Sequence, residues 1–157
     1  MSGGVKWRFH ETANSSLAIK AAVVFPSGNQ RVGHGSGRMN LALTGIAAYQ
    51  IGPWAWYGNL GLASQRQAQD ADTAAGHALL WQASAALSYE LTRNWKMLAD
   101  IGIARNPNTS AGSHPAYLLS GLIYSPNQHV DLDAGVKFGL SRAETDHQFG
   151  VGLSWRF

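Results

Sequence analysis

Six histidines are the side chains of this sequence best suited to act as catalytic bases or metal ligands: His10, His34, His77, His114, His129 and His147. A hydrolase would need a serine beside a histidine, and a zinc site would need regularly spaced histidines or cysteines. None of the six lies in the His-x-Ser-Asn arrangement of lipid A deacylases, no two have the spacing of metal ligands, and the chain has no cysteine. The sequence therefore predicts no catalytic residue, no metal site and no cofactor.

A second set of polar residues occupies alternate positions within otherwise apolar segments. It comprises Lys6, Arg8, Lys20, Asn59, Gln82, Glu90, Lys96, Asp100, Asp131, Asp133, Lys137 and Arg156. Charges that leave bulk water must be paired or hydrated, so we expect ion pairs among Asp131, Asp133, Lys137 and Arg156. Lining a pore, these side chains would tune its selectivity for ions or solutes. Packed against one another, they would instead form a salt-bridged plug, and the sequence favours neither arrangement over the other.

Alternation of apolar and small or polar residues predicts that strands carry these side chains. At the C-terminus, the apolar positions are Phe149, Val151, Leu153, Trp155 and Phe157. Seven further segments share this period, with Ile46 as an exception, and 117–124 is apolar on both faces. The nine expected strands are 5–10, 16–25, 39–50, 54–63, 79–90, 95–104, 117–124, 130–141 and 148–157.

The composition indicates which environment the apolar face meets. Only 13% of the residues are charged, whereas 45% are hydrophobic and 18 are glycine. No apolar run approaches the roughly 20 residues that a membrane helix needs. The second face is mostly Gly, Ala, Ser, Asn and Gln, rather than the Lys and Glu of a water-exposed surface. We therefore expect an all-β fold, an antiparallel up-and-down transmembrane β-barrel with lipid outside and a narrow polar lumen inside.

The expected connections alternate strictly between short and long. Short ones lie at 11–15, 50–53, 91–94 and 125–129, and longer ones at 26–38, 64–76, 105–115 and 141–146. Outer-membrane barrels have this pattern, with tight periplasmic turns and longer external loops. Aromatic residues beside the short connections predict an aromatic girdle at the periplasmic interface. The girdle would consist of Tyr49, Trp54, Tyr89, Trp95 and Tyr124.

The last strand also carries an expected recognition signal. Trp155 and the terminal Phe157 resemble the C-terminal sorting signal that the outer-membrane barrel assembly machinery reads in bacterial barrels. The expected partners are this machinery, outer-membrane lipids and small solutes. A net charge of +3 without any run of Lys or Arg indicates that nucleic acid is not a partner.

An odd number of strands is unusual for a closed single-chain bacterial barrel. We therefore expect residues 1–157 to form a single barrel domain that is N-terminally incomplete, as part of a barrel of about ten or twelve strands. The alternative is an eight-stranded barrel in which 5–10 is not a membrane strand.

Several stretches resemble the outer-membrane proteins described as belonging to a putative MetA-pathway of phenol degradation, which are transporter-like. They include Ser16–Lys20, Phe25–Gly28, Asn59–Gly61, Tyr124–Asn127 with Val130–Gly135, and Gly152–Phe157. The resemblance implies uptake or tolerance of aromatic compounds and specifies no catalytic residue. We expect a passive channel or uptake porin for small, including aromatic, solutes and no enzyme. Two alternatives stay open: a structural or adhesive barrel that binds partners through its external loops, and an outer-membrane lipid-modifying enzyme.

Overall fold

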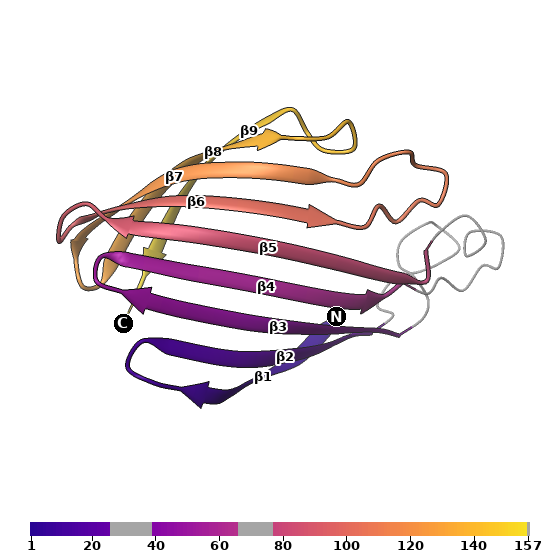
Figure 1. The fold of residues 1–157 in the computed structure, drawn as a ribbon, viewed down its shortest axis with the longest axis horizontal. Coiled ribbons are helices and arrows are strands. Elements are labelled where there is room, and N and C mark those ends of the chain that lie inside the picture. Colours follow the sequence, from indigo (N-terminus) through magenta and orange to yellow (C-terminus); the bar gives the residue numbers. More distant parts are fainter. Residues whose placement is uncertain (26–38, 66–76, 157) are drawn as a thin grey trace.

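Nine antiparallel strands in a single sheet make up the fold (Figure 1). The structure, a computed structural model, describes residues 1–25, 39–65 and 77–156. The strands are β1 (Ser2–Glu11), β2 (Ser15–Val24), β3 (Asn40–Ile51), β4 (Trp54–Ser64), β5 (Leu79–Glu90), β6 (Trp95–Ala104), β7 (Ala116–Asn127), β8 (Val130–Gly139) and β9 (His147–Trp155). Each strand pairs with its neighbours in sequence, so the expected all-β, up-and-down topology is confirmed. Within the described ranges, no helix is long and apolar enough to cross a membrane.

The strand registers keep the apolar and polar phases of the sequence on separate faces. Leu62 lies between Leu43 and Trp81, whereas the adjacent Gly61 lies between Thr44 and Gln82. This matching recurs because side chains alternate faces along a strand, so a register slip by one residue would exchange the two faces. Ile46, the exception in the sequence, lies opposite Ala18 and Asn59 and therefore belongs to the polar face.

Two irregularities modify the expected strands. The connection predicted at 125–129 is wrong at its start, because β7 continues through Ser125 and Pro126 to Asn127. Pro126 lacks a backbone N–H, and the register shifts between Tyr124 and Asn127 at this point. A second shift, between Arg8 and His10, marks a bulge in β1.

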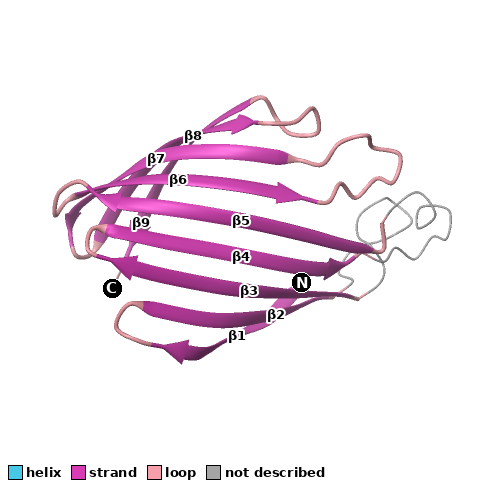
Figure 2. Ribbon diagram, in the orientation of Figure 1, coloured by secondary structure: helices cyan, strands magenta, loops and turns pink. Residues whose placement is uncertain are grey.

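The sheet curls along its strand order, so that one face is concave and the other convex (Figures 1 and 2). Large apolar side chains of the convex face are open to the surroundings: Leu60 is 71% exposed and Val151 is 88% exposed. Side chains of the concave face shield one another, and Ser88 is only 3% exposed. Among the described residues, no large side chain is fully buried. The sheet is thus a single layer with no hydrophobic core of its own.

The short connections lie at one end of the sheet, and the longer connections at 105–115 and 140–146 lie at the other (Figure 1). The short ones join β1 to β2, β3 to β4, β5 to β6 and β7 to β8. Trp155 of β9 lies opposite Val130, directly after the short β7–β8 turn, so β9 ends on the side of the short turns.

The two edges of the sheet are β1 and β9, and the described strands show no pairing between them. Because every neighbouring pair is antiparallel, these two strands run in the same direction. Val5 to His10 lie within β1, so the eight-stranded alternative, which left this segment out, does not agree with the sheet.

Candidate functional site on the concave face

The polar residues singled out in the sequence share the concave face. Rows of register partners cross the sheet: one joins Lys6, Lys20, Thr44, Gly61 and Gln82, and the parallel rows hold the other expected positions in strands. Arg156, just beyond β9, reaches the same face through its contact with Asp131. That this face lines a pore stays a prediction.

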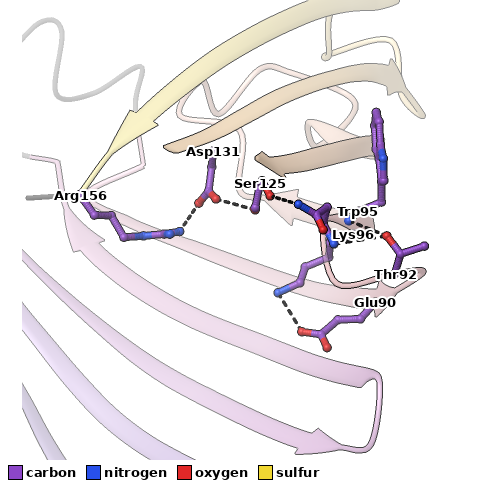
Figure 3. Close-up of polar contacts among 8 residues, drawn as sticks. Glu90, Thr92, Trp95, Lys96, Ser125, Asp131 and Arg156 are labelled. Carbon is purple, nitrogen blue, oxygen red and sulfur yellow. Dashed lines mark hydrogen bonds and ion pairs between the residues drawn. The ribbon is translucent and has the colours of Figure 1, made fainter. Parts of the chain in front are cut away.

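One group of polar contacts on this face lies near the short turns (Figure 3). Arg156 forms an ion pair with Asp131, whose other carboxylate oxygen accepts a hydrogen bond from Ser125 Oγ at 2.6 Å. Lys96 Nζ lies 3.4 Å from Glu90 Oε1, and the two side chains point toward one another. Of the ion pairs expected among Asp131, Asp133, Lys137 and Arg156, the structure shows the one between Asp131 and Arg156.

Lys137 and Asp133, the other two residues expected to form ion pairs in this group, do not pair with Asp131 or Arg156. Lys137 pairs with Glu144, at 2.9 Å, instead of with either aspartate. Asp133 has no ion-pair partner among residues 1–25, 39–65 and 77–156, and its carboxylate extends over Gly152. In β1, the bulge brings Glu11 onto the face of Arg8, where the two form an ion pair. Neither Glu11 nor Glu144 was anticipated from the sequence.

Glu144 belongs to a cluster that spans three strands and the β8–β9 connection. Lys137 Nζ lies 5.0 Å from the ring centre of Tyr117, whose hydroxyl donates to Asp100 Oδ2 at 3.1 Å. The Tyr117 ring lies over Gly102, where a Cβ atom would come within 2.5 Å of it. Asp100 Oδ1 is buried without a hydrogen-bond partner in the described part of the chain.

The pKa of Glu144 is lowered from its ordinary value. The main cause is the hydrogen bond from Lys137 Nζ, and the backbone N–H of Thr145 contributes a second hydrogen bond. Both contacts favour the ionised carboxylate, which can accept them, over the protonated acid. Glu144 is therefore held as an anion facing the Lys137 ammonium group.

Two hollows lie on the concave face beside this cluster. The larger, of about 450 Å³, lies over β6 to β9 and is bordered by Leu98, Leu119 and Ile123. The smaller, of about 190 Å³, is lined by Asn59, Gln82, Ser84, Tyr117 and Glu144. Tyr117 and Glu144 border the smaller hollow while Lys137 borders the larger, so the cluster separates the two.

The residues of the expected aromatic girdle lie on the convex face near the short turns, and their place at a membrane interface stays a prediction. Trp54 and Tyr89 are register partners whose rings lie 4.5 Å apart, and Trp95 and Tyr124 repeat this arrangement at 4.7 Å. Tyr49 lies opposite Trp56 in the same region. Trp155 projects from the end of β9 and is 67% exposed, whereas Phe157 lies outside the described residues.

The described histidines show no arrangement suited to hydrolysis. His114 accepts a hydrogen bond from the backbone of Asn106, and the ring of His129 contacts the carbonyl oxygen of Arg156. No described histidine contacts a serine hydroxyl, and no cluster of three metal-ligating side chains occurs among the same residues. His34 lies outside the described residues.

A family model described as "Putative MetA-pathway of phenol degradation" matches residues 2–157. No curated protein matches the chain.

Proposed function

Because the chain belongs to the family described as the putative MetA-pathway of phenol degradation, we propose that it is a bacterial outer-membrane β-barrel protein that lets small solutes, aromatic ones among them, pass passively along its concave face. One observation carries the proposal: a single-layer sheet with an exposed apolar convex face and a shielded polar concave face. The family description names a pathway of phenol degradation and assigns no catalytic step to this chain.

The apolar side chains of the convex face would be more stable in contact with lipid than with water. Leaving apolar surface in water costs about 25 cal/mol per Å², and large side chains from Val5 to Trp155 are exposed along all nine strands. The paired aromatics near the short turns match the interfacial girdle of membrane barrels, in which rings lie at the depth of the lipid headgroups. Short turns at the periplasmic end and long connections outside complete this orientation.

Passage would depend on the groups that the concave face presents. The ion pairs Asp131–Arg156 and Glu90–Lys96 leave little net charge near the short turns. Asp133 has no such partner in the described ranges, and Lys6 lies opposite Lys20 at the other edge of the sheet. A solute would therefore meet patches of both signs, which tune selectivity without a tight binding step.

Ion conduction through the refolded protein in a planar bilayer tests this function. We expect discrete conductance steps, and replacement of both Asp131 and Asp133 by asparagine should shift the reversal potential toward anion preference under a salt gradient. Folded protein that inserts into bilayers and gives no steps would contradict the channel. A heat-modifiable band on a gel provides the control that each variant is folded.

A structural barrel with a filled interior is the second candidate. The observation that favours it is the cluster of Asp100, Tyr117, Lys137 and Glu144, which occupies the concave face between the two hollows. Such a protein would insert into bilayers, show the heat-modifiable band and remain electrically silent.

A further inference from the structure

Three glycines in a single row of register partners form the floor of the larger hollow. The registers of β7, β8 and β9 place Gly121 opposite Gly135 and Gly135 opposite Gly150. Leu98 of β6 lies opposite Gly121 and closes the row at one end. Because none of the three glycines has a side chain, bare backbone lies at the bottom of a hollow of about 450 Å³. This volume lies within the range of about 300–1,000 Å³ that is usual for small-molecule sites.

The two rows that flank the glycines form the walls. One wall holds Ile123 and Asp133, and the other holds Leu119, Lys137 and Gln148. Leu98, Leu119 and Ile123 thus make one end of the hollow apolar, while Asp133, Lys137 and Gln148 make the other polar. A flat, partly apolar molecule matches this division better than a sugar or a free ion does.

The two charged side chains at the polar end, Lys137 and Asp133, differ in whether they have an ion-pair partner. Lys137 is engaged by Glu144 and by the face of the Tyr117 ring, so its charge is balanced inside the cluster. Asp133 has no ion-pair partner in the part of the chain that the structure describes, and it lies against Gly152. An ionised carboxylate only accepts hydrogen bonds. A ligand in the hollow would therefore have to donate a hydrogen bond to the Asp133 carboxylate.

We propose that this hollow is a binding site for phenols. The ring lies over the backbone of Gly121, Gly135 and Gly150, its edge contacts Leu98, Leu119 and Ile123, and its hydroxyl donates a hydrogen bond to Asp133. Aromatic carboxylates, which have the same ring, are rejected because their charge repels that of Asp133. This inference rests on the proposed function and adds to it a site and an order of preference among aromatic solutes.

Equilibrium dialysis of radiolabelled phenol and benzoate against the refolded protein in detergent micelles, with protein-free micelles as the blank, tests the site. We expect the protein to prefer phenol to benzoate by about ten-fold or more, as the hydrogen bond to a charged acceptor implies. Asp133→Asn should reduce the preference to a few-fold, because the amide no longer repels benzoate. Equal binding of the two solutes by the unmodified protein would overturn the proposal.

A glycine substitution tests the location independently of charge. A Cβ atom added at Gly150 would meet nothing within 4 Å, so the side chain of Gly150→Val would project into the hollow where the phenol ring is placed. Gly58→Val is the matched control, since a Cβ atom there is equally unobstructed but Gly58 lies on the convex face. We expect Gly150→Val to abolish phenol binding and Gly58→Val to leave it intact.

The outcomes separate this site from the proposed function. Conductance steps without phenol binding would overturn the site and leave the channel standing. Phenol binding that survives Gly150→Val in a protein with a heat-modifiable band would place the ligand elsewhere and also overturn the site. Binding that depends on Gly150 and Asp133 in an electrically silent protein would support the site and contradict the channel.

Discussion

Lys137 of β8 and Glu144 of the following connection are joined by a 2.9 Å contact, with only 22% and 17% of the two side chains exposed. The carboxylate of Glu144 thus turns back over the concave face instead of extending into the surroundings. Partly shielded ion pairs of this kind contribute more than fully exposed ones, because solvent screens them less. The pair therefore fixes the β8–β9 connection against the inner face of the sheet.

Replacing Glu144 by glutamine should release this connection. The neutral amide keeps a hydrogen-bonding oxygen but loses the attraction to the Lys137 ammonium group, which we expect to cost about 1 kcal/mol. The chain contains no cysteine, so a spin label at Thr145→Cys reports on this connection alone. The electron paramagnetic resonance spectrum should sharpen in Glu144→Gln. Asp146→Asn, a neighbouring carboxylate without a side-chain contact in the described residues, should leave the spectrum unchanged.

Acid should have the same effect as this substitution. Since the hydrogen bonds from Lys137 and Thr145 lower the pKa of Glu144, its contribution is fully present above the ordinary pKa of a glutamic acid and is lost as the pH falls through the lowered value. The spin label at Thr145→Cys should report a constant, restricted connection from neutral to weakly acidic pH and release only in stronger acid. A label already mobile at pH 7 would contradict the anchor, as would one equally restricted in Glu144→Gln.

The Asp131–Arg156 pair should matter more for stability than Asp133, which has no ion pair among the described residues. In Arg156→Gln, Asp131, whose side chain is mostly shielded, loses its ion pair and keeps, among the described residues, its contact to Ser125. We expect a loss of about 1–3 kcal/mol in the free energy of unfolding, measured by urea titration in lipid vesicles. Asp133→Asn is the comparison, because no ion pair is broken in the described chain. Equal destabilisation by both substitutions would mean that the ion pair contributes nothing specific.

Gly102 should tolerate no side chain while Tyr117 is present. A Cβ atom there would lie 2.5 Å from the Tyr117 ring, so Gly102→Ala must displace the ring and break its 3.1 Å hydrogen bond to Asp100. We expect a destabilisation of about 1–3 kcal/mol, as for other overpacked sites. Combining Gly102→Ala with Tyr117→Ala should recover part of this loss. Gly58→Ala, where the added atom is unobstructed, should be close to neutral.

The stacked pair of Trp54 and Tyr89 should contribute beyond the area that it covers. Their rings lie 4.5 Å apart across β4 and β5. A double-mutant cycle with Trp54→Leu and Tyr89→Leu should give a coupling free energy of about 0.5–1.5 kcal/mol in the folded, vesicle-bound protein. If the free-energy changes of the two substitutions were strictly additive, the contact between the two rings would contribute nothing to stability.

The period of two predicted most of the strands and their faces from sequence. Leu62 and Gly61 illustrate why: once one face is apolar, only one register aligns it with the neighbouring strands. The extent of β7 was missed because both of its faces are apolar and because Pro126 resembles the start of a turn. Strand periodicity placed Asp131 and Arg156 on the same face, but it did not single out their contact from the other possible pairs among Asp131, Asp133, Lys137 and Arg156.

The contacts that were not predicted share a physical cause. Glu11 reaches Arg8 only because the bulge shifts the phase of β1 between them, and a bulge leaves no clear mark in this sequence. Glu144 lies in a connection, where no period indicates a direction, so its contact with Lys137 depends on how the connection folds back. The glycine row of the larger hollow depends on three registers at once, and single-strand patterns do not reveal how strands align.

The shared direction of β1 and β9 sets a rule of parity for any closed form of this sheet. A seam that joined these two edges directly would be the one parallel pair, with slanted hydrogen bonds between strands that otherwise exchange perpendicular ones. A ring made of antiparallel pairs alone requires an odd number of additional strands between the edges, and hence an even total. The hydrogen-bond geometry at the edge of β1 or β9 would therefore distinguish direct parallel pairing of these two strands from closure through additional antiparallel strands.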